Sequence, residues 1–487
     1  MQIKFKIMVC YFFHVILLTN FFTYSRDTRT TIDSQYELMP AMLAPITRQP
    51  TSPPLLVEPK PWTIMVYMAA DNDLRGFAAR NIKQMAAIGS SEHINIVVQL
   101  DIRISGDKKI TRRYYIEKGH ILHMNADDAT SQGMDSGDAN TLISFCTWAI
   151  ENYKANDYAL ILWNHGTGII DPVKGRIINA SELFNFNPAT NKLELDRSVG
   201  FLDLMDAVNS LHLRINFAED PGRGIAWDDS TGNYLTNQKL DFALSEIKSK
   251  VLKGKRFSII GFDACLMSMI EIANLIKPYA HIMVSSQEVE LGTGWDYAQA
   301  LVQFATQKSP SKKSFAKQIV KAYENTYMQL TNDYTQSAIN LEIVDLIEAD
   351  VNAISIILLE CFKKQKNNSV QTALKTSRNK LLLTHFDEPT YIDLYDLFSN
   401  LQTNIKFFEL TNEAESKKLK EELSNALTLA KQHIESIVFA NTCGKNLIGA
   451  HGLSIYFPER RIHASYRKTP FAQSNEWTSL LTQYLLL

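Results

Sequence analysis

The chain has 487 residues, of which 45% are hydrophobic and 21% are charged, as is usual for a globular protein. Lysine and arginine number 50 and aspartate and glutamate 52, so the net charge is −2 and no basic excess points to nucleic acid as a partner. Five scattered cysteines without a CxxC pair exclude a disulfide framework and indicate no zinc site. A chain of this length predicts two globular units after a leader.

The start of the chain reads as a leader followed by a linker. Residues 1–25 combine a basic beginning, Lys4 and Lys6, with a mostly apolar run over residues 7–18, which is typical of a signal peptide. The run is short for a membrane span, so an uncleaved anchor is the less favoured alternative. Residues 26–60 are polar and then rich in proline, which predicts an extended linker or pro-segment. We therefore expect a secreted or cell-envelope protein, which meets a membrane only if the leader stays uncleaved.

Residues 61–311 alternate between strand and helix patterns, which predicts an α/β domain with a mostly parallel sheet covered by helices on both faces. Unbroken apolar runs predict buried strands at residues 62–70, 94–100, 159–163 and 281–285, with a further strand that begins at Ile259. Helical periodicity marks residues 74–88 and 139–153. Residues 171–220 interrupt this alternation with an irregular segment.

The pattern changes at about residue 312, after which helical periodicity dominates. The predicted helices cover residues 315–331, 341–362, 391–401 and 413–438. Two short strands follow, of which residues 452–457 form the clearest. We interpret residues 312–487 as a mainly helical C-terminal domain.

Two predicted strand ends carry side chains suited to catalysis. Cys265 follows the strand that begins at Ile259, and a helix predicted directly behind it would favour the thiolate. His165 lies in a glycine-containing loop just after the strand at residues 159–163. If these strands are neighbours in one parallel sheet, both side chains emerge at the same edge, as in a cysteine hydrolase. The competing interpretations are a buried core cysteine and a structural loop histidine.

Six segments of the chain share a characteristic order. They are WTIMVYMAADNDL (62–74), NHG (164–166), GIAWDDSTGNYLTNQKL (224–240), DACLM (263–267), SSQEVELGTGWDY (285–297) and GLSIYFP (452–458). Together they resemble the clostripain family of cysteine peptidases, and this agreement in order is more specific than any single motif. The resemblance implies a caspase-like fold for the sheet domain.

The resemblance also implies roles for individual residues. Cys265 would attack the scissile carbonyl to form an acyl-enzyme, and His165 would protonate the leaving amine. The backbone amides of Gly166 and Cys265 would form the oxyanion hole. In the caspase-like fold the two catalytic side chains need no aspartate partner.

The family resemblance implies cleavage after arginine or lysine, which requires a carboxylate at the base of a deep pocket. Asp296 is the leading candidate for this acid, and Glu288 and Glu290 compete with it. Asp263 lies two residues before Cys265, and it either shapes the pocket, holds the Cys265 loop or caps the following helix.

The segment between His165 and Cys265 corresponds to the activation loop of the family. The resemblance implies self-cleavage there, and Lys174 and Arg176 are the candidate processing positions. No cofactor is required, although some members of the family need calcium. Two acid pairs could supply oxygen ligands or, equally, cap turns, and they are Asp71, Asp73, Asp228 and Asp229.

We therefore expect a cysteine endopeptidase that acts on proteins or peptides with basic residues. Within the enzyme class, the alternative is a transpeptidase or ligase that uses the same His165 and Cys265. From another class, the alternative is a catalytically silent surface-binding module that retains the fold.

Overall fold

The computed structural model describes residues 58–105, 108–124, 133–170, 184–187, 192–195, 224–379 and 381–486. The predicted signal peptide, nearly all of the predicted linker, Lys174 and Arg176 lie outside the described residues. Strands β6 (Phe184–Asn187) and β7 (Lys192–Leu195) pair with each other as an antiparallel hairpin.

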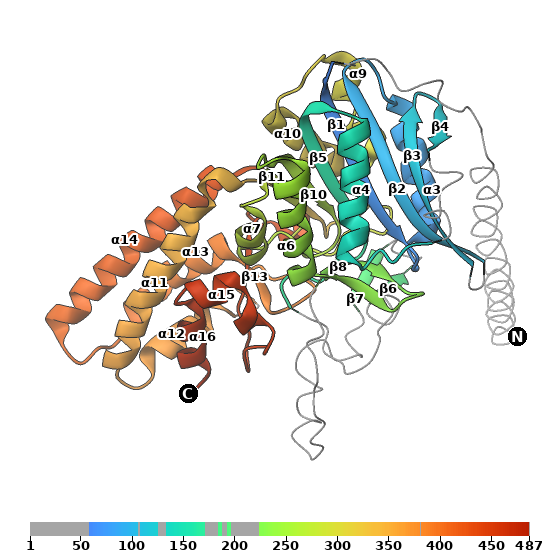
Figure 1. Cartoon of the computed structure of the whole chain (residues 1–487). Helices are drawn as coiled ribbons and strands as arrows, with labels where there is room; N and C mark the ends of the chain where they lie inside the picture. The colour runs from blue at the N-terminus through green and yellow to red at the C-terminus, as the bar shows by residue number, and fades with distance from the viewer. Residues whose placement is uncertain are drawn as a thin grey trace, which may run out of the picture. The chain divides into compact units, whose positions relative to one another are not determined.

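The main sheet has nine strands in the order β14-β12-β11-β10-β5-β1-β2-β3-β4 (Figure 1). Their bounds are β1 (Lys60–Ala70), β2 (Ile94–Ser105), β3 (Lys108–Glu117), β4 (His120–His123), β5 (Ala155–Trp163), β10 (Phe257–Asp263), β11 (Ala280–Ser285), β12 (Thr335–Asn340) and β14 (Val438–Cys443). The five central strands, from β11 to β2, pair in parallel, and antiparallel strands flank them at both margins. The prediction of a mostly parallel sheet is confirmed.

Helices cover both faces of this sheet, because its central strands are apolar on both sides. Residues 62–70 of β1, for example, are all buried. One face carries α3 (Arg75–Ile88), α8 (Tyr297–Ala300), α9 (Gln303–Thr306) and α10 (Lys312–Tyr327). The other face, nearer the viewer in Figure 1, carries α4 (Ala139–Asn152), α6 (Asn237–Glu246) and α7 (Ile270–Ile276).

The C-terminal part of the chain is mainly helical, but it also extends the sheet. Strands β12 and β14 lie beyond residue 312 and join the sheet next to β11. Residues 391–393 do not begin a helix as expected but form β13 (Tyr391–Asp393), which pairs with β15 (Ser454–Tyr456). The remaining helices are α11 (Val344–Lys364), α12 (Ser369–Ser377), α13 (Leu394–Asn404), α14 (Glu413–Ile437), α15 (Pro470–Ser474) and α16 (Trp477–Leu485). A domain boundary at residues 311/312 stays a prediction, since the sheet crosses it.

None of the described helices is both long and apolar enough to span a lipid bilayer.

The strand order determines where a site can form. From β1 the chain first adds β2 on one side and then β5 on the other, so the order reverses between β1 and β5. Ligands of open α/β sheets bind in the crevice outside the carboxyl ends of strands at such a reversal. A hairpin of β8 (Gly224–Asp228) and β9 (Asn233–Thr236) packs against β1 and β5.

Candidate active site

His165 and Cys265 occupy matched positions on two adjacent strands. Strands β5 and β10 pair in parallel, and their last paired residues are Trp163 and Asp263. His165 and Cys265 therefore each lie two positions after the last residue pair of these strands, Trp163 and Asp263. The amide of Asn164 donates a hydrogen bond of 3.3 Å to the carbonyl of Asp263, which extends the pairing one step past β5. The expectation that these strands are neighbours is confirmed.

The environment of the Cys265 thiol differs from the one expected. Leu266 takes a left-handed conformation with φ of 63°, and α7 begins only at Ile270, so no helix starts directly behind the thiol. Cys265 is only 1% exposed, and this burial, followed by the charge of Glu290, raises the pKa of its thiol. The backbone amides of Glu290 and Gly166 act in the opposite sense but are outweighed. Burial therefore favours the neutral thiol over the expected thiolate.

The loop after β5 packs directly on the Cys265 backbone. A Cβ atom at Gly166 would lie 2.6 Å from the carbonyl oxygen of Cys265, so only glycine fits there. A hydrogen bond from the Gly166 amide acts to lower the pKa of the Cys265 thiol. An oxyanion hole formed by the amides of Gly166 and Cys265 remains a prediction.

His165 is fully buried and is engaged by an acid from the adjacent strand. Its Nε2 atom lies 2.6 Å from Oδ1 of Asp73, which follows the end of β1. Burial acts to raise the pKa of Asp73, but the charge and hydrogen bond of His165 outweigh it and the pKa lies below its ordinary value. From the sequence, Asp73 was expected only to bind calcium or to cap a turn. The sequence offered one sign of this pairing. Asp73 follows a predicted strand, and that strand could lie next to the strand that precedes His165.

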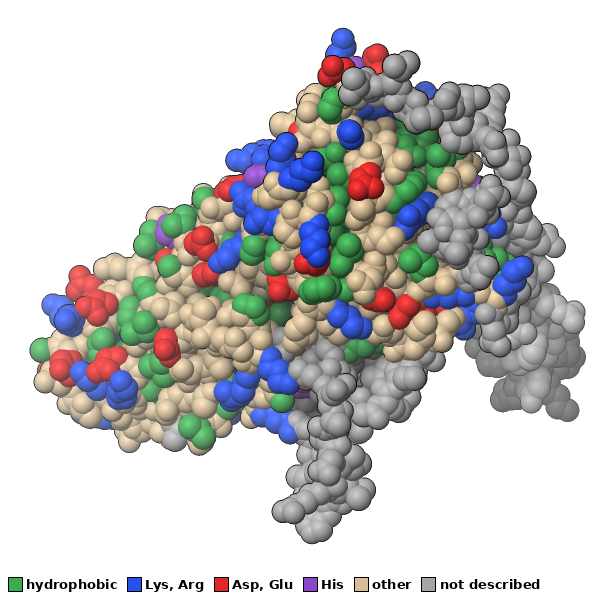
Figure 2. Space-filling view, viewed as in Figure 1, with side chains coloured by type: hydrophobic (Ala, Val, Ile, Leu, Met, Phe, Trp, Pro, Cys, Tyr) green, Lys and Arg blue, Asp and Glu red, His purple; other side chains and the backbone are tan. Residues whose placement is uncertain are grey.

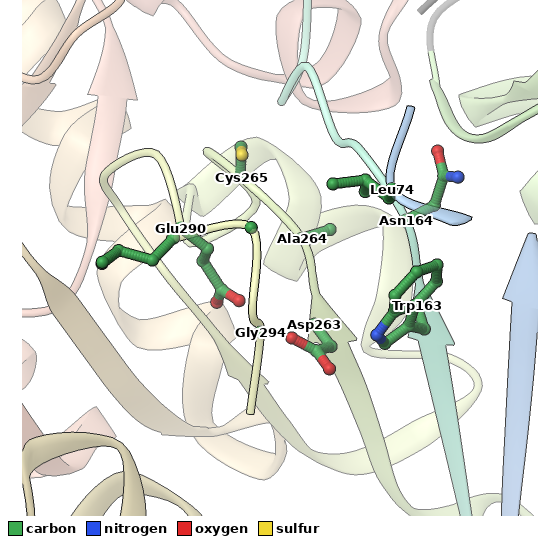
Figure 3. Close-up of a pocket in the computed structure, with 10 residues that line it drawn as sticks. Leu74, Trp163, Asn164, Asp263, Ala264, Cys265, Glu290 and Gly294 are labelled. Carbon is green, nitrogen blue, oxygen red and sulfur yellow. The ribbon is translucent and has the colours of Figure 1, made fainter. Parts of the chain in front are cut away.

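A small pocket adjoins Cys265, and two acids contribute to its wall (Figure 3). The residues that line it are Leu74, Trp163, Asn164, Asp263, Ala264, Cys265, Glu290, Leu291, Gly292 and Gly294. Asp263 accepts hydrogen bonds from the Trp295 amide at 3.0 Å and the Tyr297 hydroxyl at 2.8 Å. A Cβ atom at Gly294, where φ is +59°, would lie 2.6 Å from Oδ1 of Asp263. Asp263 thus lines this pocket and does not cap α7, whose N-cap is Met269, and its role in specificity stays a prediction.

The leading candidate for the specificity acid lies outside this pocket. Asp296 is the N-cap of α8 and accepts a hydrogen bond of 3.1 Å from the amide of Gln299. Helix α8 begins one residue later, so the Asp296 carboxylate is used to satisfy a free backbone amide in the first turn of that helix. Glu288 accepts from the amides of Val289 and Asp387 at 2.7 and 3.1 Å and does not line the pocket either. Of the four acids considered, only Asp263 and Glu290 line it.

The four calcium candidates do not converge on one site. The ammonium group of Lys109 pairs with Asp71, Asp101 and Asp228. Its Nζ atom lies 3.5 Å from a carboxylate oxygen of Asp71 and 2.8 Å from one of Asp101. Asp73 pairs with His165, and Asp229 donates its amide to the carbonyl of Asp71 at 2.9 Å. Within the described residues no group of three or more His, Cys, Asp or Glu could hold a metal ion. The donor set therefore does not fit calcium, because a lysine already supplies the positive charge.

The ends of the segment between His165 and β8 lie at the same edge of the sheet. The amide of Ile170 donates to the hydroxyl of Tyr391 at 3.0 Å. The carbonyl of Gly224 accepts a hydrogen bond of 3.4 Å from the hydroxyl of Thr167. The described residues on either side of positions 171–223, Ile170 and Gly224, are thus each held by a hydrogen bond.

Comparisons with known proteins agree on one family. A model of the clostripain family matches residues 66–195 and 216–484. Clostripain from Hathewaya histolytica is 23% identical over 445 residues, which cover 81% of this chain and 74% of that protein.

Two solved structures share the fold. One is an X-ray structure of a secreted C11 cysteine protease from Bacteroides thetaiotaomicron in complex with an irreversible peptide inhibitor, with a TM-score of 0.53 and 19% identity over 86% of this chain and 99% of that one. The other is an inactive zymogen C11 protease from Parabacteroides distasonis, with a TM-score of 0.53 and 18% identity over 88% of this chain and 99% of that one.

Proposed function

The chain belongs to the clostripain family of cysteine peptidases, and from this premise we propose that Cys265 and His165 cleave peptide bonds after arginine or lysine. The observation that carries the proposal is the matched placement of the two residues beyond the Trp163–Asp263 rung of β5 and β10. The acid-lined pocket that adjoins Cys265 supports the preference for a basic residue.

In the proposed reaction the Cys265 thiol passes its proton to His165, and its sulfur attacks the scissile carbonyl carbon. The tetrahedral oxyanion that forms is stabilised by backbone amides, for which Gly166 and Cys265 are the candidates. The carbon–nitrogen bond then breaks, His165 protonates the leaving amine, and a thioester to Cys265 remains. Water hydrolyses this acyl-enzyme and restores the thiol.

Specificity for a basic residue follows from the cost of burying an unpaired charge. A guanidinium or ammonium group that enters a closed pocket must find a carboxylate there, because the loss of hydration costs several kcal/mol per ion. Asp263 and Glu290 are the acids available beside Cys265. We therefore assign the specificity pocket to them instead of Asp296.

The burial of both catalytic candidates supports a precursor that needs activation. Cys265 is almost completely buried, and His165 pairs with Asp73. Self-cleavage within residues 171–223, with Lys174 and Arg176 as candidate positions, would cut the connection between the loop of His165 and β8. A protein of similar fold from P. distasonis is an inactive zymogen, which supports the same scheme.

Export through residues 1–25 completes the proposal. The basic start and the apolar run of this segment are typical of a signal peptide. A protein of similar fold from B. thetaiotaomicron is secreted, which supports an extracellular or envelope location.

The proposed function can be tested by profiling the purified protein against a peptide library, with Cys265→Ala as the control. Cleavage confined to bonds after arginine or lysine, and absent from the control, is the expected result. Cleavage after other residues, or equal cleavage by the control, would overturn the proposal.

A further inference from the structure

We propose that Glu290 and Asp263 form a carboxyl pair that shares one proton in the free enzyme, and that a basic side chain entering the pocket displaces this proton. Glu290 is then a second specificity-determining residue beside Asp263. This inference rests on the proposed cleavage after arginine or lysine and deepens it.

The geometry of the pocket brings the two acids together. Figure 3 shows the carboxyl groups of Glu290 and Asp263 on the same side of the Cys265 sulfur, with Asp263 on β10 and Glu290 on the loop after β11. Asp263 is held by the Trp295 amide and the Tyr297 hydroxyl, so its position is fixed. Both acids line the pocket that contains Cys265.

The carboxyl group of Glu290 is buried without an ordinary hydrogen-bond donor, as expected of a group that contacts substrate. It is only 3% exposed, and neither of its carboxyl oxygens accepts a hydrogen bond of ordinary geometry from a donor among the described residues. The Asp263 carboxyl lies within hydrogen-bonding reach of it. The side chains of Trp295 and Gln336 approach it and act to lower its pKa, yet neither forms a hydrogen bond of ordinary geometry with it. Buried polar groups are nearly always satisfied, so Glu290 needs either a proton shared with Asp263 or a donor from a bound substrate.

The charges around the pair favour a shared proton. Burial raises the pKa of Asp263 to about 6. Burial and then the charge of Asp263 raise the pKa of Glu290 well above its usual range. Two adjacent buried carboxyls cannot both ionise cheaply, so the pair carries one negative charge at neutral pH.

The other titratable groups that face the pair are neutral at this pH. They are the thiol of Cys265 and the hydroxyls of Tyr297 on α8 and of Tyr323 and Tyr327 on α10, and burial raises the pKa of each. Glu288, near the Cys265 thiol, also has a pKa raised by burial, to about 8. Among the charged groups that shift these pKa values in the described part of the chain, Arg80 is the one cation. Its charge acts to lower the pKa of Tyr327.

A basic substrate side chain changes this balance. Its positive charge favours the doubly ionised pair, so the shared proton leaves for solvent and the substrate cation takes its place. The net charge of the pocket is unchanged by this exchange. Affinity for a basic side chain should therefore rise by up to about tenfold per pH unit while the free pair is protonated and the complex is not. A neutral side chain of the same length releases no proton.

The test measures proton release from the active enzyme by calorimetry in two buffers with different ionisation enthalpies. The probes are two peptide aldehydes, one ending in lysine and the other in norleucine. Addition of a thiol to an aldehyde is proton-neutral, so any proton released comes from the pocket. The variants are Glu290→Gln and, as a matched control, Glu288→Gln, whose amide oxygen can still accept from Val289 and Asp387.

We expect about one proton released with the lysine aldehyde near neutral pH, by wild type and Glu288→Gln. None should be released with the norleucine aldehyde, or by Glu290→Gln. Wild type that prefers lysine peptides but releases no proton would overturn the inference and leave the proposed function intact. Wild type with no preference for lysine over norleucine peptides would overturn both.

A second readout needs no variant. The ratio of kcat/KM for lysine over norleucine substrates of wild type should rise with pH through the neutral range. A ratio that stays flat would overturn the inference even if Glu290→Gln fails to fold.

Discussion

Nε2 of His165 lies 2.6 Å from Oδ1 of Asp73, so the imidazole nitrogen is engaged by an acid from the end of β1. The Cys265 thiol is meanwhile buried, and this burial raises its pKa and favours the neutral form. The site is therefore closed, with the Cys265 thiol buried and Nε2 of His165 paired with Asp73. The activation that we propose would therefore have to release His165 as well as expose Cys265.

Replacement of Asp73 by asparagine should lower stability at neutral pH by about 1.5–3 kcal/mol, the usual contribution of a hydrogen bond to a charged group. The folded pKa of Asp73 lies below its ordinary value of 3.8, so its contribution is complete above that value and is lost as pH falls through the folded pKa. The difference in unfolding free energy between wild type and Asp73→Asn should shrink in acid. Denaturation at a series of pH values measures it, and a difference that stays constant into strong acid would contradict the pairing.

The assignment of the pocket predicts different effects for two aspartates. Asp263→Asn should abolish the preference for basic residues, because it removes a carboxylate from the pocket. Asp296→Ala should cost about 1 kcal/mol of stability through loss of the α8 N-cap but leave the preference unchanged. Peptide profiling of both variants measures these outcomes. Loss of the preference in Asp296→Ala alone would return the pocket to that residue.

Self-processing predicts a difference on a denaturing gel. Wild-type protein should yield two chains separated by a cut within residues 171–223, one with His165 and the other with Cys265. Cys265→Ala should remain a single chain, because it lacks the proposed nucleophile. A single wild-type chain that is fully active would contradict the activation scheme.

Calcium should not be required, because Lys109 provides the positive charge that its three carboxylate neighbours need. Chelation should leave the activity of wild type within about twofold. Lys109→Met should cost about 3–5 kcal/mol of stability, the usual loss when a buried ion pair is broken from one side. Lys108→Met alters an exposed neighbour on the same strand and is the matched control. Loss of wild-type activity on chelation and its return with calcium would contradict this.

The central strands could be predicted from the sequence because a short, unbroken apolar run between polar segments is typical of a strand buried on both faces. The marginal strands β12 and β14 could not, since TQSAIN and VFANTC lack such runs and join the sheet only through antiparallel partners distant in the chain. The start of the third expected C-terminal helix was wrong for a similar reason. Residues 391–393 pair with β15, a contact that helical periodicity does not reveal.

His165 and Cys265 could be identified because each directly follows an apolar strand. The partner of His165 could not, because strand order is set by tertiary packing and β1 flanks β5 only in the folded sheet. The choice between Asp296 and Glu290 also depended on the path of a loop. That path is set by the contacts of Asp263 with Trp295 and Tyr297, which no local pattern encodes.

The most direct test of the central claim is to label the processed protein with a lysine-ended peptide acyloxymethyl ketone and map the adduct by mass spectrometry. We predict a thioether on Cys265, absent from Cys265→Ala and formed about 10³-fold more slowly in His165→Ala. Cys443, the most accessible of the described cysteines, should stay unlabelled. An adduct on Cys443, or equal labelling of Cys265→Ala, would contradict the assignment of Cys265 as the nucleophile.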